Sequence, residues 1–179
     1  MEVHRTAVRA AVLSGCLAVV AAAPAGAQTS NGTLTVTATV QASISLSFET
    51  DGAGVSLTGA GTNAATLGFG TVSAYGTIAT AGVTRTLTAS DFTVSSPFGA
   101  RVDKANSTSA TYTLAVRLGS ADATNTWKVN AITLTTSNQN LGAAYAYGST
   151  QVHTVYLTVP FAATAGAINK VLNFTATAN

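Results

Sequence analysis

Residues 33–48 read TLTVTATVQASISLSF, and apolar and polar side chains alternate along them without a break. Successive side chains of a β-strand point to opposite faces, so a period of two gives one apolar and one polar face. The run therefore predicts one long strand over 33–48, about 50 Å in length if it is fully extended. Its first apolar residues are Leu34, Val36, Ala38 and Val40.

The 27 residues that open the chain have the pattern of a Sec signal peptide. A positive start (Arg5, Arg9) is followed by an apolar stretch over 10–23 and by the small-residue cleavage site Ala25-Gly26-Ala27. We expect this helical leader over 1–27 to be removed. Residues 28–179 then form a secreted or cell-surface protein without a stable membrane span.

Leu13-Ser14-Gly15-Cys16 resembles a bacterial lipobox, which gives a second interpretation in which Cys16 is lipidated. The apolar stretch continues beyond this cysteine, so we favour simple cleavage. Cleavage after Ala27 leaves no cysteine, which excludes disulfides, a thiolate nucleophile and cysteine-based metal sites from residues 28–179.

Composition narrows the class of protein further. Residues 28–179 carry six Lys and Arg against five Asp and Glu, and the basic residues are scattered. Nucleic-acid binding needs a clustered basic face, so we expect no nucleic-acid partner. The length suits one domain with its own core, and the abundant Thr, Ser, Val and Ala suit a pleated sheet.

Short alternating runs separated by Gly, Asn and Ser turns continue to the end of the chain. Beyond 33–48 we expect strands over 55–58, 67–72, 83–89, 91–95, 100–104, 111–118, 127–135, 155–161 and 172–178. Pro97 ends one of them, the phase change at Asn130-Ala131 indicates a bulge, and Pro160 hints at an edge strand. The longest irregular stretches are 59–63 and 138–150. The pattern predicts an all-β chain with a single β-sandwich over 28–179, of Ig-like or jelly-roll-like topology.

Residues that could carry chemistry are few. His153 is the one histidine after residue 27, and the five carboxylates are scattered. We therefore expect no catalytic residues, no metal site and no cofactor, with His153 as a structural strand residue. Trp127, Tyr145 and Tyr147 are candidate sugar-stacking aromatics, with the two tyrosines in a Gly/Ala-rich loop. The interpretation that we favour places Trp127 in the core and the tyrosines in packing or subunit contacts.

Three segments carry a resemblance to a known family: NGTLTVTATV at 31–40, LGFGTV at 67–72 and LNFTATA at 172–178. Together they resemble the spore coat protein U and fimbrial-subunit group of secreted bacterial β-sandwiches. The resemblance implies a surface or fimbrial subunit. The chain departs from that group in having no cysteine pair after residue 27 and no tyrosine at the extreme C-terminus.

These observations favour a non-enzymatic structural subunit of a bacterial cell-surface assembly, such as a pilus, fibre or coat. The subunits would self-associate into a homo-oligomer or filament by β-strand addition. The strand over 33–48 either folds back on its own domain or is donated to a neighbour, and we favour donation. The alternatives are a secreted carbohydrate-binding or adhesive module, with a glycan as partner, and a secreted hydrolase.

Overall fold

A computed structural model describes residues 31–179 of the chain, so the expected signal peptide and Cys16 lie outside the described residues. The chain divides into two units, one ending at Ala38 and one covering Thr39–Asn179. The described part of the first unit, residues 31–38, contains no strand, and all of its side chains are exposed.

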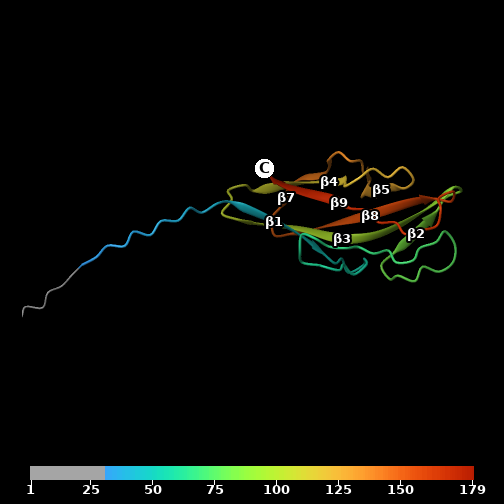
Figure 1. Cartoon of the computed structure of the whole chain (residues 1–179), viewed down its shortest axis with the longest axis horizontal. Coiled ribbons are helices and arrows are strands. Elements are labelled where there is room, and N and C mark those ends of the chain that lie inside the picture. The colour runs from blue at the N-terminus through green and yellow to red at the C-terminus, as the bar shows by residue number, and fades with distance from the viewer. Residues whose placement is uncertain (1–30) are drawn as a thin grey trace, which may run out of the picture. The chain divides into compact units, whose positions relative to one another are not determined.

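The second unit is all-β, without a helix among its described residues, and it has two antiparallel sheets in the manner of a β-sandwich (Figure 1). This confirms the predicted all-β class, and the two sheets are consistent with the predicted β-sandwich. The strands are β1 (Ser43–Glu49), β2 (Thr84–Leu87), β3 (Asp91–Ala105), β4 (Thr111–Leu118), β5 (Thr126–Val129), β6 (Ile132–Thr133), β7 (Gln139–Ala146), β8 (Thr150–Pro160) and β9 (Leu172–Ala178).

The two sheets differ in size. The larger has the order β1-β3-β8-β5-β6, and β2 pairs with the first part of β3 on the same side as β1. The smaller sheet has only three strands, in the order β7-β4-β9. The last strand of the chain is therefore an edge strand of the smaller sheet.

The core lies between the sheets and is built from alternate residues of β3, β4, β5 and β8. On β4, Tyr112, Leu114 and Val116 are fully buried and the residues between them are partly exposed, as the alternation predicts. Burying each such aliphatic side chain contributes about 1.5–3 kcal/mol. The predicted strands 111–118 and 172–178 are confirmed at both ends.

The predicted strand over 33–48 is wrong in its first half. β1 begins at Ser43, which pairs with Ala105, the last residue of β3. A strand needs a partner for its N–H and C=O groups, and β3 offers none beyond Ala105. The ten residues 33–42 therefore keep the alternating pattern of a strand but lie outside the ladder between β1 and β3.

Pro97 does not end a strand as predicted, because β3 runs through it without interruption. Pro97 lies opposite Thr154 of β8, whose N–H and C=O both bond to Asn130 on the other side of β8. The pair is thus a non-hydrogen-bonded one, and the Pro97 nitrogen faces the gap between β1 and β2. Because the nitrogen faces this gap, the N–H that proline lacks removes no hydrogen bond from the ladder.

Two further predictions of local structure are wrong for related reasons. Asn130 and Ala131 form a two-residue turn between β5 and β6, with Asn130 at φ 53°, a left-handed conformation that asparagine tolerates; there is no bulge. Pro160 ends β8, a central strand and not an edge one. The ladder with β5 stops at Thr158, so the Pro160 nitrogen meets no carbonyl there.

The remaining differences concern loops and strands. Residues 139–146, expected to be irregular, form β7, which pairs with β4 through register shifts. Residues 55–58 and 67–72, expected to be strands, form none, although Thr58 and Thr66 make an isolated bridge. Residues 59–63 contain no strand, as expected.

Candidate functional site: an apolar groove beside an open strand edge

The outer edge of β9 is unpaired within the described part of the chain. On its inner side, the Gly119 N–H donates to the Val171 carbonyl at 2.8 Å, and the Asn179 N–H donates to the Thr111 carbonyl at 3.0 Å. Residues of an antiparallel strand alternate in the side to which their N–H and C=O point. The backbone groups of Leu172, Phe174, Ala176 and Ala178 therefore face the open edge.

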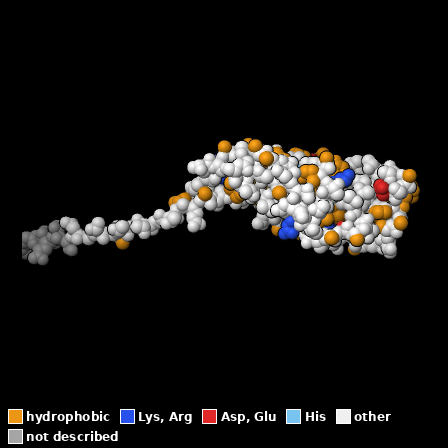
Figure 2. Space-filling view, turned by 90° about the horizontal axis from the view of Figure 1, so that it is seen from above, with side chains coloured by type: hydrophobic (Ala, Val, Ile, Leu, Met, Phe, Trp, Pro, Cys, Tyr) orange, Lys and Arg blue, Asp and Glu red, His pale blue; other side chains and the backbone are white. Residues whose placement is uncertain are grey.

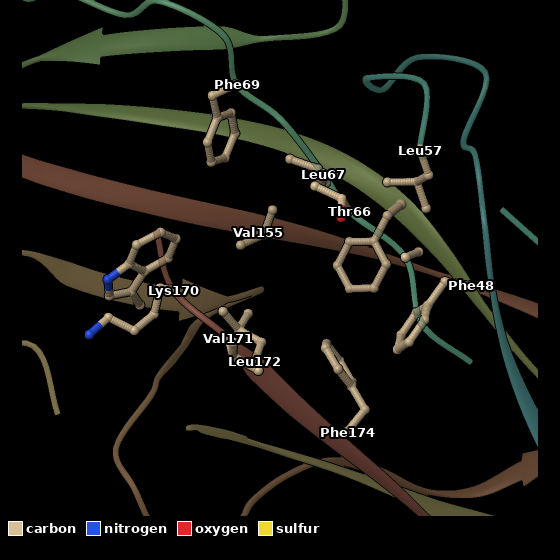
Figure 3. Close-up of a pocket in the computed structure, with 13 residues that line it drawn as sticks. Phe48, Leu57, Thr66, Leu67, Phe69, Val155, Lys170, Val171, Leu172 and Phe174 are labelled. Atoms are coloured by element: carbon tan, nitrogen blue, oxygen red, sulfur yellow. The ribbon is translucent and has the colours of Figure 1, made fainter. Parts of the chain in front are cut away.

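An apolar groove of about 280 Å³ lies beside this edge, between the two sheets and the segment 65–69. We call it the β9 groove. Figure 3 shows side chains from opposite sides of the groove pointing toward one another. The residues that define its walls are Phe48, Leu67, Phe69, Phe98, Leu172 and Phe174.

Aromatic packing builds one end of the β9 groove. The Phe174 ring lies edge-on to Phe48, with centroids 5.1 Å apart, and to Phe98, with centroids 5.7 Å apart. Such edge-to-face pairs favour a fixed arrangement of the rings. Three strands, β1, β3 and β9, are thereby joined at this end by rigid apolar surface.

A polar cluster builds the other end. The indole Nε1–H of Trp127 donates to Asp122 Oδ2 at 2.8 Å, and Lys170 Nζ lies 3.8 Å from the same oxygen. Burial opposes the charge on Asp122, but hydrogen bonds from Asn125, Trp127 and Thr124 outweigh it and lower the pKa of the carboxyl to about 2. Asp122 therefore stays ionised and holds the indole in place.

We expect Asp122→Ala to destabilise the domain by about 1–3 kcal/mol, because it leaves the buried Trp127 N–H and the Asn125 N–H without acceptors. Urea unfolding followed by tryptophan fluorescence measures the change. Asp51→Ala is the matched control, since Asp51 accepts one turn hydrogen bond, from the Ala53 N–H, and should cost less. Equal losses in the two variants would contradict this role of Asp122.

The apolar residues of 34–40 are exposed to solvent. Leu34 is 87 % exposed, Val36 81 % and Val40 72 %, and Ala38 is also exposed. We call these four residues the N-terminal apolar row. Exposed apolar residues in a regular row are uncommon on a monomeric domain.

Of the sequence-predicted candidates for sugar stacking, Trp127 lines the β9 groove, whereas Tyr145 and Tyr147 do not. Trp127 is only 7 % exposed and belongs to the core, as the favoured interpretation expected. Tyr145 and Tyr147 are half-buried and pack on Tyr112, with ring centroids 5.6 and 5.3 Å away. Tyr145 lies on β7 and not in a loop. No two of these three aromatics form an exposed platform.

His153 is buried in the core of the sandwich, with 2 % of it exposed. Asn130 accepts the Thr154 N–H through Oδ1 at 2.9 Å, which turns its amide nitrogen toward His153 Nδ1 at 3.0 Å. Nδ1 must therefore accept, and the proton of the neutral ring lies on Nε2, which is buried without a partner among the described residues. The aromatic rings of Phe98 and Tyr145 pack against it. This surrounding disfavours a charged imidazole.

The burial of His153 lowers its pKa, so the unfolded chain binds a proton more readily than the folded one. We expect the free energy of unfolding to fall as the pH drops below about 6.5, by up to about 1.4 kcal/mol per pH unit. Urea titrations between pH 7.5 and 5 measure this slope. In His153→Gln the slope over that range should disappear. The same slope in both proteins would exclude His153 as its source.

Charged groups are sparse over the described surface. Figure 2 shows isolated Lys, Arg, Asp and Glu side chains among hydrophobic and uncharged ones on the face in view. Within residues 31–179, no three His, Cys, Asp or Glu side chains gather as a metal site would require. Over the same residues, no helix is long and apolar enough to cross a membrane.

Sequence reasoning identified the N-terminal apolar row but not the β9 groove. The groove depends on which strand ends the smaller sheet, and no local pattern of residues encodes that order. Comparison with known proteins adds no relative, since no protein-family model, curated protein or solved structure matches the chain.

Proposed function

We propose that this chain is a non-enzymatic structural subunit of a bacterial cell-surface assembly, and that it associates by β-strand addition. The N-terminal apolar row of one subunit enters the β9 groove of another, and its backbone bonds to the open edge of β9. The proposal includes export by the signal peptide at 1–27. The strand topology of the sandwich stays a prediction, either Ig-like or jelly-roll-like.

One observation carries this proposal: an unpaired segment with an exposed alternating face exists in the same chain as an apolar groove beside an unpaired strand edge. Main-chain hydrogen bonds would supply affinity along the β9 edge, and pockets for alternate side chains would supply specificity. Leu34, Val36, Ala38 and Val40 have the spacing that such pockets require.

The sequence around Gln41 and Ala42 supports donation rather than fold-back. Only these two residues separate Val40 from Ser43, where β1 begins. A strand that returned along β1 would need a two-residue hairpin, and such turns favour glycine or asparagine at positive φ. Neither residue occurs there.

The non-enzymatic part of the proposal rests on the surroundings of His153. A general base must reach a substrate, whereas this ring is enclosed by Phe98, Tyr145 and Asn130. Its polar neighbour is an amide, and no carboxylate orients it among the described residues.

Electron microscopy of the exported protein tests the proposed function. We expect filaments or another ordered assembly in which each subunit contacts the next. A monodisperse monomer would overturn the proposal. Saturable retention on polysaccharide would then favour a carbohydrate-binding module, and turnover of ester, peptide or glycoside substrates that is lost in His153→Ala would favour a hydrolase.

A further inference from the structure

The segment Leu67–Val72 packs on the core without joining a sheet. Leu67, Phe69 and Val72 contact the core cluster, and the residues between them are exposed. The structure gives the backbone groups of 67–72 no hydrogen-bond partner within the described residues. Gly70 has φ 67°, so the extended part of this segment is 67–69, and its backbone groups are free to take a partner.

The direction of these free backbone groups follows from Thr66. Its N–H donates to the Thr58 carbonyl at 2.8 Å, and its carbonyl accepts the Thr58 N–H at 3.1 Å. In an extended chain the next residues alternate, so the N–H and C=O of Leu67 and Phe69 point away from Thr58. The side chains of Leu67 and Phe69 line the β9 groove.

Two rows of unpaired backbone groups therefore border one groove: those of β9 on one side and those of Leu67 and Phe69 on the other. Figure 3 shows Leu67 and Phe69 on one side of the groove and Leu172 and Phe174 on the other. A strand with one neighbour leaves half of its N–H and C=O groups to water, whereas a strand with two neighbours bonds them all.

From this arrangement we propose that the segment Leu67–Phe69 is the second wall of the acceptor site. A strand from another copy, residues 33–40, lies between β9 and this segment and hydrogen-bonds to both. The inference rests on the proposed function and adds a partner to it: assembly converts 67–69 from an unbonded segment into a strand of the smaller sheet. Gly68 suits the wall, since a Cβ there would meet nothing within 4 Å.

Disulfide trapping tests the two walls separately, in a Cys16→Ser background that leaves the introduced cysteines as the only thiols. Donor variants carry one cysteine on the polar face, at Thr33, Thr35, Thr37 or Thr39. One acceptor variant is Thr175→Cys, on the exposed face of β9, and the other is Gly68→Cys. Cross-strand neighbours lie within the reach of a disulfide. Gly166→Cys, which also has open space around its Cβ, is the control.

We expect donor cysteines to form disulfides with both Thr175→Cys and Gly68→Cys in assembled material, and not with Gly166→Cys. Trapping by Thr175→Cys without Gly68→Cys would overturn the second wall and leave the proposed function standing. Disulfides with Gly68→Cys but not with Thr175→Cys would overturn the claim that the donated strand binds to both walls. No trapping at either site would overturn the proposed function and this inference together.

Hydrogen exchange on the unaltered protein gives a second readout that needs no variant. The amides of Leu67 and Phe69, whose N–H groups would bond to the donated strand, should exchange at least about tenfold more slowly in assembled material than in unassembled subunits. Slower exchange confined to the amides of β9 would overturn the inference and keep the proposed function. Unchanged exchange at both places would count against both.

Discussion

We expect Val36→Asp to abolish the proposed assembly and to leave the subunit folded. Val36 is 81 % exposed and belongs to no strand, so a carboxylate there adds no buried charge to the subunit. In the assembled state the same side chain would enter the apolar β9 groove, where an unpaired charge costs several kcal/mol. Electron microscopy and size-exclusion chromatography measure the loss of assembly. Urea unfolding should give a midpoint close to that of the unaltered protein.

Thr37→Asp is the matched control, because it places the same charge on the opposite face of the same segment. It should assemble, since that face stays in solvent in the proposed contact. Deletion of 28–39 should likewise leave a folded subunit that does not polymerise. An unfolded Val36→Asp subunit would show instead that the apolar row belongs to the core of its own domain.

Gly54→Ala has the largest expected effect on stability. A Cβ at Gly54 would lie 2.1 Å from the carbonyl oxygen of Pro97. That oxygen belongs to the backbone of β3, the longest strand, and cannot move without disturbing the ladder with β8. We expect a loss of about 3 kcal/mol or more, at the upper end of the cost of overpacking. Thermal and urea unfolding measure it.

Gly52→Ala tests the same turn without the clash. Gly52 lies two residues earlier, and a Cβ there would meet nothing within 4 Å. Its φ lies outside the left-handed region, so alanine should be neutral or stabilise by about 0.4–1 kcal/mol. If both variants lose the same stability, the close approach of Gly54 to Pro97 is not the cause.

The sequence predicts the strands whose two faces differ in burial and misses those that depend on distant partners. The bounds of β4 and β9 are predicted correctly, because their alternation coincides with a buried face on β4 and a partly buried face on β9. β7 was missed, since its Gly/Ala-rich composition hides the pattern and its pairing with β4 shifts register. The segment 67–72 has the alternation of a strand but no partner, so side-chain packing alone explains it.

The candidate site likewise has a part that the sequence predicts and a part that it does not. The N-terminal apolar row could be read from residues 33–48, because alternation is local. The residue at which pairing begins, Ser43, could not be predicted, because it depends on β3 ending at Ala105. To predict the β9 groove, one needs the strand order of the smaller sheet. To predict the burial of His153, one needs the position of the Asn130 turn. Both depend on pairings between distant parts of the chain.

In the proposed contact, the open edge of β9 gives a chain of subunits a direction. The N-terminal apolar row and the β9 groove are two different surfaces, so each subunit that donates its segment to the next in line makes a head-to-tail contact, and this contact repeats into a filament where the rotation between subunits does not close a ring. A filament of such contacts has one end with an empty groove and one end with a free segment. The two ends therefore differ chemically, and elongation, termination and attachment to a cell each require a partner suited to one end alone.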